Sequence, residues 1–295
     1  MKIRNILFVL VLLTACAENN IKSDAYGNFE ATEVIISSKA NGSILEFTIE
    51  EGDVIGKDKL VGLIDSTDLY LKKQQALKQK NAIASRIASI DSQIAVQEQQ
   101  LSNLVVDQKR TKKLYHDGAA TQKQLDDING GVNLIKKQIA ATKVQKNGIL
   151  DEIEALEMQI AQIEEGISYC YIKNPVKGTV LTKLAEAGEV TNFGKPLYKI
   201  ANLDVVKLKV YISGAQLPEI KLGQEVEVLI DKDAKSNTKL KGKISWISET
   251  AEFTPKTIQT KDERVNLVYA VKVNVVNDGS LKIGMPGEIN FISKQ

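Results

Sequence analysis

The side chains that most often carry acid–base, nucleophilic or metal chemistry are few in this sequence of 295 residues. His116 is its single histidine, so neither a His-based metal site nor a Ser-His-Asp triad can be built. Glu50-Glu51 and Asp126-Asp127 are carboxylate pairs, but adjacent side chains on a strand or helix point in different directions. The sequence has no glycine-rich loop with a lysine that could cradle a phosphate. We therefore expect a protein that is not an enzyme and has no cofactor or metal of its own.

Cys16 is the residue for which the sequence predicts a covalent modification. A basic start and a short apolar stretch over residues 6–13 lead to Leu13-Thr14-Ala15-Cys16. That stretch is too short to span a bilayer, and small residues before a cysteine resemble the bacterial lipobox, where the thiol is acylated. We expect a lipoprotein signal peptide over residues 1–15 and a lipid anchor at Cys16, which places the mature chain outside the cytoplasm. The alternative is an ordinary secretory signal with a chance cysteine.

Charge and cysteine content bear on two further properties, nucleic-acid binding and disulfide bonding. The formal net charge is +2, and charges so nearly balanced give no reason to expect nucleic acid as a partner. Cys170 is the second cysteine, and acylation of Cys16 leaves it without a disulfide partner. It lies in a strand-like run, Tyr169-Cys170-Tyr171-Ile172, and is interpreted as a small buried apolar residue.

A long helical region dominates the elements that could position a site. No proline occurs from residue 69 to residue 166, and apolar residues recur there in steps of three and four. The first arm has Ile83, Ile87, Ile90, Ile94, Leu101 and Leu104, and the second has Leu125, Ile128, Val132, Ile135, Ile139, Thr142, Ile149, Ile153, Leu156, Ile160, Ile163 and Ile167. Only Gln97 and Lys146 interrupt the rhythm. A sustained period of 3.5 residues is typical of a coiled-coil seam.

A short turn separates the two arms. Gly118 can take a positive φ at a helix C-terminus, and Thr121 can cap the next helix, with Gln124 completing a capping box. The sequence therefore predicts an antiparallel coiled-coil α-hairpin over residues 67–168 with its tip near 115–121. Arms of ~45 residues would be roughly 70 Å long, which is the length of a spacer.

The segments on either side of the hairpin resemble each other. Residues 41–54 and 177–190 each open a short alternating strand with a glycine and place a second glycine ten positions later. Such a repeat predicts two halves of one small β-sandwich, over residues 37–66 and 169–204.

The C-terminal third is strand-like. We expect a small β-barrel over residues 205–252 and a terminal β-module over 253–295. Residues 16–36 are expected to form the anchor segment and the first strand of that module. The predicted fold class is α+β and elongated, with a split sandwich interrupted by the hairpin.

This order of elements resembles the membrane fusion proteins, the HlyD-type periplasmic adaptors. The sequences over residues 253–264 and 267–272 look like the ABC-transporter-linked branch, and Gly284-Met285-Pro286-Gly287 fits the usual last turn. The resemblance implies that the sandwich halves are lipoyl-like and that the terminal β-module (253–295) is membrane-proximal. Lipoyl and biotinyl carriers present a modified lysine where these halves join, but Asp65-Ser66-Thr67-Asp68 offers none.

The tip carries the most specific local resemblance. Adaptors that dock on TolC-type channels have an arginine, a leucine four residues on and a serine seven further. Arg110, Leu114 and Thr121 hold those positions here, with threonine in place of serine. The resemblance implies that Arg110 offers donors to the channel, Leu114 an apolar knob and Thr121 a hydroxyl. Taken singly, they are a solvated arginine, a seam residue and a helix cap.

The resemblance implies a set of partners. These are an inner-membrane ABC-type transporter, a TolC-type outer-membrane channel and further copies of the chain, commonly six. The location implied is the periplasm, with the lipid anchor in the inner membrane. Two alternatives stay open: a structural lipoprotein whose hairpin is a scaffold, and the adaptor of a proton-driven efflux pump. Ala17 stands where an aspartate is often linked to inner-membrane retention, and the exported substrate is not encoded in any motif.

Overall fold

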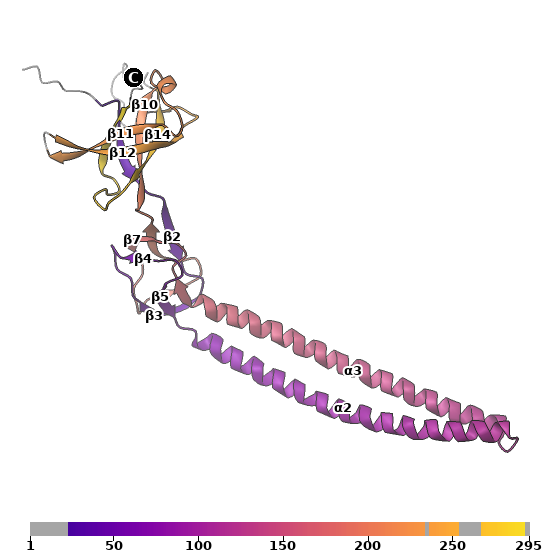
Figure 1. The fold of residues 1–295 in the computed structure, drawn as a ribbon. Helices are drawn as coiled ribbons and strands as arrows, with labels where there is room; N and C mark the ends of the chain where they lie inside the picture. The colour runs from indigo at the N-terminus through magenta and orange to yellow at the C-terminus, as the bar shows by residue number, and fades with distance from the viewer. Residues whose placement is uncertain (1–22, 234–235, 254–266, 293–295) are drawn as a thin grey trace, which may run out of the picture.

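Three bodies follow one another along an elongated molecule: a β-barrel, a β-sandwich and a long helical hairpin (Figure 1). The computed structural model describes residues 23–233, 236–253 and 267–292, so Cys16 and the expected signal peptide lie outside it.

The hairpin consists of α2 (Thr67–His116) and α3 (Gln122–Tyr169). A helix of 50 residues is about 75 Å long. Every apolar residue of the predicted seam, together with Thr142, is buried or partly buried, because these positions face the opposite helix. The prediction of a coiled-coil hairpin is therefore confirmed.

Ion pairs cross the hairpin on the flanks of this seam. They join Lys73 to Glu164 at 2.7 Å, Lys80 to Glu157 at 2.6 Å, Lys146 to Asp91 at 2.7 Å and Lys143 to Glu98 at 3.3 Å. Partly exposed pairs contribute at most about 1 kcal/mol each, so their main effect is to favour one register. Lys146, which interrupts the apolar rhythm, thus has a partner on the facing helix.

The sandwich has two four-stranded sheets, in the orders β2-β9-β7-β4 and β6-β5-β3-β8. The strands before the hairpin are β2 (Glu33–Ser37), β3 (Gly42–Phe47), β4 (Val54–Ile55) and β5 (Leu60–Ile64). Those after it are β6 (Tyr171–Lys173), β7 (Gly178–Lys183), β8 (Val190–Thr191) and β9 (Pro196–Ala201). Each sheet takes two strands from either side of the hairpin, so the two repeats interleave around one core.

The root of the hairpin is part of this sandwich. β5 and β6 are neighbours in one sheet, and the Ile64 N–H donates to the Cys170 carbonyl at 2.8 Å. Cys170 is fully buried, as expected. The two helices therefore leave the sandwich from adjacent, hydrogen-bonded positions.

The barrel closes on itself. Its strands are β1 (Ala25–Glu30), β10 (Val205–Ser213), β11 (Glu225–Asp233), β12 (Ser236–Ile247), β14 (Leu267–Val276) and β15 (Pro286–Phe291), with the 3₁₀ turn η1 (Leu217–Glu219) and the short β13 (Glu252–Phe253). The order is β10-β1-β15-β11-β12-β14, and β10 also pairs with β14. Closure gives both edges of β10 a partner, which removes open strand edges.

The structure corrects two predicted boundaries. The described strands of the expected barrel (205–252) and of the expected terminal module (253–295) form one barrel, because β14 pairs along the whole of β10 and β15 lies between β1 and β11. The expected anchor unit (16–36) is also divided: β1 belongs to the barrel, whereas β2 pairs with β9 in the sandwich. The two connections between barrel and sandwich, 31–32 and 202–204, therefore leave the same end of the barrel.

Candidate functional site

The hairpin tip is built on a tight helix ending. Gly118 has a φ of +74°, its N–H donates to the Tyr115 carbonyl at 3.1 Å, and the Ala119 N–H donates to the Leu114 carbonyl at 2.8 Å. This pair of hydrogen bonds is the Schellman motif, which satisfies carbonyls left free at the end of α2. The predicted positive φ of Gly118 is confirmed.

Thr121 begins the second helix. Its hydroxyl oxygen accepts from the Gln124 N–H at 3.3 Å, and its own N–H donates to Gln124 Oε1 at 2.8 Å. The Thr121 hydroxyl also lies 3.1 Å from Gln124 Oε1 and can donate to it. The capping box predicted from the sequence is thus confirmed, and the hydroxyl is held at the surface in a fixed orientation.

Arg110 and Leu114 lie one turn apart on the same face of α2. The Arg110 side chain is 71% exposed, and its Nη1 lies 3.3 Å from Asp107 Oδ1. This exposed pair contributes little and uses one of five guanidinium donors, so the others face solvent. Leu114 is 43% exposed, which is more than packing in the seam would leave. The structure therefore places all three predicted tip residues at one exposed end of the hairpin.

Three further residues at or just below the tip were missed by the sequence analysis. Tyr115 is exposed beside Leu114 and adds an aromatic side chain to this surface. Below the turn, Gln108 Nε2 donates to Asn129 Oδ1 across the two helices at 2.7 Å. Gln108 continues the spacing of the α2 seam, which is the signal that could have identified it. This hydrogen bond ties the arms together next to the tip.

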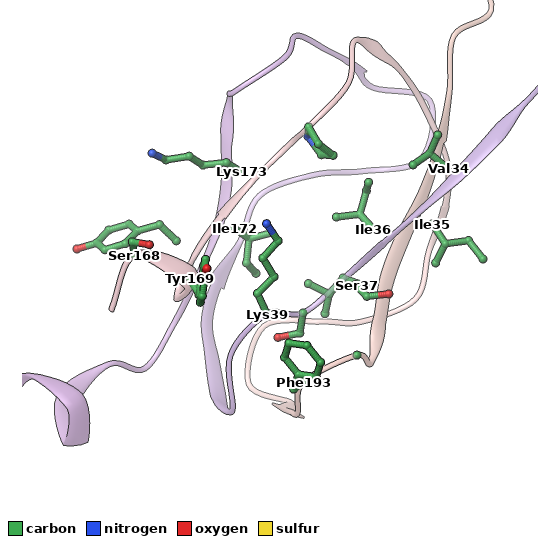
Figure 2. A pocket seen from close by; sticks show the side chains of 15 residues that line it. Val34, Ile35, Ile36, Ser37, Lys39, Ser168, Tyr169, Ile172, Lys173 and Phe193 are labelled. Carbon is green, nitrogen blue, oxygen red and sulfur yellow. The ribbon is translucent and has the colours of Figure 1, made fainter. Parts of the chain in front are cut away.

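A hollow lies at the opposite end of the hairpin from the tip, between β2, β6 and the base of α3. Its volume is about 540 Å³, and Figure 2 shows Lys173 and Tyr169 on one side of it and Val34 and Ile35 on the other. Lys39 Nζ lies 5.5 Å from the centre of the Tyr169 ring, a cation–π contact. The lining is mainly apolar and open, so it can hold an apolar group.

The side chains whose pKa is shifted lie away from the hairpin tip. Burial raises the pKa of Tyr198 to about 12 and also raises the pKa of the Cys170 thiol, both in the sandwich. Among the described residues, no three or more His, Cys, Asp or Glu side chains gather as a metal site would need. Within those same residues, no helix is both long enough and apolar enough to cross a membrane.

Sequence comparisons link the chain to membrane proteins. A family model described as "LcnD-like, C-terminal domain" matches residues 202–295. A UPF0194 membrane protein of Yersinia enterocolitica is 27% identical over 294 residues, which cover 90% of this chain and 88% of that protein. A UPF0194 membrane protein of Acidithiobacillus ferridurans is 26% identical over 295 residues, covering 90% of this chain and 86% of the relative.

Solved structures show the same architecture. MacA from Actinobacillus actinomycetemcomitans aligns with a TM-score of 0.58 at 21% identity, covering 90% of this chain and 76% of MacA. The membrane fusion protein Spr0693 from Streptococcus pneumoniae aligns with a TM-score of 0.55 at 16% identity, covering 92% and 98% of the two chains. The chain thus has the fold of the membrane fusion proteins along nearly its full length. The resemblance recognised from the sequence is confirmed at the level of the fold.

Proposed function

We propose that this chain, which has the membrane fusion protein fold, is the periplasmic adaptor of a tripartite export system. Acylated Cys16 holds it to the inner membrane, its barrel end meets an ABC-type transporter, and its hairpin tip meets a TolC-type outer-membrane channel. No cofactor takes part. The proton-driven pump adaptor and the structural scaffold are the competing functions.

The observation that carries this proposal is the placement of the two ends. Chain entry at Ser23 lies at the barrel end remote from the sandwich, because β1 starts beside the end of β15 and runs toward β2. The tip lies at the opposite extreme of the molecule (Figure 1). A lipid anchor at one end and an exposed tip at the other suit a bridge between two membranes.

The tip chemistry supports docking on a helical protein surface. Arg110 presents free donors that can reach carbonyl or carboxylate oxygens, and arginine is enriched among the few interface residues whose truncation costs about 2 kcal/mol or more. Leu114 can enter a groove between helices, and Thr121 has a hydroxyl whose position the capping box fixes. The hairpin, about 75 Å long, brings these groups far from the anchored end.

The adaptor acts as an oligomer in this proposal. One copy cannot enclose a conduit, so several copies, six in the simplest case suggested by the family, surround a common axis. Conformational states of the transporter that contact the barrel differently would then shift the equilibrium between channel conformations through the hairpin.

In-cell photocrosslinking tests the proposal. A photoreactive residue at Leu114 is expected to crosslink to an outer-membrane channel, and Arg110→Ala in the same chain is expected to weaken that crosslink. Val96, which is 58% exposed midway along α2, is the matched control position and should give no channel product.

A second arm separates the competing functions. Deletion of the gene should abolish an export-dependent resistance that the intact gene restores and the Arg110→Ala gene does not. The scaffold function replaces the adaptor function if two results are found together. An expressed, lipidated protein gives no channel crosslink at Leu114, and deletion of the gene leaves export unchanged. Co-purification with a transporter that lacks an ATPase would favour the proton-driven pump.

A further inference from the structure

The barrel end remote from the sandwich presents apolar side chains to solvent. Leu222 is 70% exposed and Ile292 is 51% exposed. Both line one open hollow of about 970 Å³, together with Asp24, where the chain enters the barrel, and with Glu219, Lys221, Gly223, Gln224, Glu225 and Phe291. The exposed apolar groups and the chain entry therefore share one surface, which we name the basal surface.

Leu222 stands in a turn that is held firmly. Gly223 has a φ of +83° and its N–H donates to the Ile244 carbonyl at 2.8 Å. The Lys221 N–H donates to Gln224 Oε1 at 2.9 Å, and the Gln224 N–H returns to the Lys221 carbonyl at 3.1 Å. Ile220, two residues before Leu222, is buried in the barrel core. The barrel is thus closed without Leu222, and burial of this leucine needs something beyond the residues that the structure describes.

The length of the chain before the barrel limits what that something is. From Cys16 to Ser23 the chain reaches at most about 25 Å, at 3.3–3.6 Å per residue. The ten-residue strand β14 is about 33 Å long, so the tether is shorter than this strand. A lipid on Cys16 therefore holds the basal surface close to the membrane.

We propose that the basal surface rests on the lipid bilayer that carries the anchor, with Leu222 and Ile292 entering the headgroup layer. This inference rests on the lipidation of Cys16 in the proposed function. Lys221, exposed beside Leu222, can meet lipid phosphates. Glu219 and Glu225 lie on the same rim and oppose deep insertion, whereas the Asp24 carboxylate is engaged by the Phe291 N–H at 2.7 Å. The contact is therefore shallow.

A shallow contact is sufficient because the anchor makes it intramolecular. Once one end of the chain is held at the membrane, a weak second contact forms at a high effective concentration. Two points of attachment fix the tilt of the barrel, which a single flexible tether does not. The consequence is a hairpin that points away from the membrane before either protein partner is bound.

Depth-dependent fluorescence tests the contact without relying on cellular acylation. The mature chain, residues 16–295, is coupled through the Cys16 thiol to vesicles of phosphatidylethanolamine and phosphatidylglycerol that contain a maleimide lipid. Cys170 is fully buried and does not compete. Trp246 is the single tryptophan, so Trp246→Phe gives a silent background. Leu222→Trp is then the reporter, and Val276→Trp, at a position 76% exposed near the opposite barrel end, is its matched control.

Brominated lipids are expected to quench the Leu222→Trp variant and to shift its emission to shorter wavelength, while the Val276→Trp variant keeps its emission. Ile292→Trp provides a second basal reporter if the first variant does not fold. Equal emission from basal and control reporters, with or without brominated lipid, overturns the proposal and leaves the basal surface to a protein partner. Mass spectrometry of the protein from cells tests acylation of Cys16 separately, so failure of the anchor and failure of the contact are distinguishable.

Discussion

The sandwich encloses a core between two sheets, whereas the hairpin buries a single seam between two helices. Val61, Ile64, Leu197, Tyr198 and Ile200 in the sandwich have no exposed surface. By contrast, α2 has three buried residues among 50 and α3 has five among 48. A side chain in the sandwich is surrounded, while one in the seam is covered from one direction. The difference separates stability, which is concentrated at the sandwich, from reach, which the hairpin supplies.

The same substitution in both regions should give the largest difference. Leu197→Ala in the sandwich core is expected to lower the free energy of unfolding by about 3–5 kcal/mol, because the closed core cannot collapse around the cavity. Leu156→Ala in the seam is expected to cost about 2 kcal/mol, since its two helices can move together. Urea denaturation followed by circular dichroism measures both. Equal costs would show that the seam is as enclosed as the sandwich.

A buried polar side chain sharpens the comparison. Asn174 is fully buried, donates to the Gly56 carbonyl at 2.9 Å and accepts from the Tyr198 hydroxyl at 3.0 Å, which joins the two halves of the sandwich. Asn174→Ala leaves these groups unpaired and should cost about 1–3 kcal/mol. Asn147→Ala, at an exposed position of α3, should change stability by no more than about 0.5 kcal/mol. The same denaturation measurement distinguishes them, and a neutral Asn174→Ala would contradict a structural role for this network.

Replacement by alanine should have opposite effects on stability at two glycines of the hairpin. Gly118 has a positive φ, so Gly118→Ala is expected to destabilise the hairpin by about 1 kcal/mol although a Cβ would meet nothing within 4 Å. Gly148 lies in the middle of α3, where an added Cβ also meets nothing within 4 Å, so Gly148→Ala should stabilise it by about 1 kcal/mol. Thermal melting of the helical signal measures both changes. A shift of the same sign for both would mean that the turn does not require its left-handed residue.

The hairpin could be predicted from the sequence because the residues that define it are close together along the chain. The spacing of residues such as Ile83 and Val132 identifies the seam, and Gly118 and Thr121 mark its turn. A small barrel was predicted, but the inclusion of β14 and β15 was missed, because alternation in β10 shows which face of the strand is buried but not which strand borders each edge. The partner of Val205 is Val276, far along the chain. The same limit hid the division between β1 and β2.

The hairpin tip depends both on local sequence and on contacts between distant segments. Arg110, Leu114 and Thr121 were identified by their resemblance to the motif of TolC-docking adaptors, and their exposure became visible only with the ending of α2. The Gln108–Asn129 hydrogen bond depends on the register of the two helices, which a single-sequence pattern does not fix. Exposure of Leu222 likewise depends on how the barrel closes, which places Ile220 inside and the turn outside.

Arg110→Ala is the smallest expected change in stability and the strongest test of the separation between stability and reach. The Arg110 pair with Asp107 is exposed and within one helix, so its loss should change the free energy of unfolding by no more than about 0.5 kcal/mol. Arg86→Ala, at an exposed position of α2 far from the tip, is the matched control and should be equally neutral. If Arg110→Ala weakened the channel crosslink but Arg86→Ala did not, while both kept their unfolding midpoints, the effect would belong to docking. A fall in the midpoint for Arg110→Ala alone would instead make the arginine part of the hairpin's own structure, because a contact made only with a partner leaves the isolated chain unchanged.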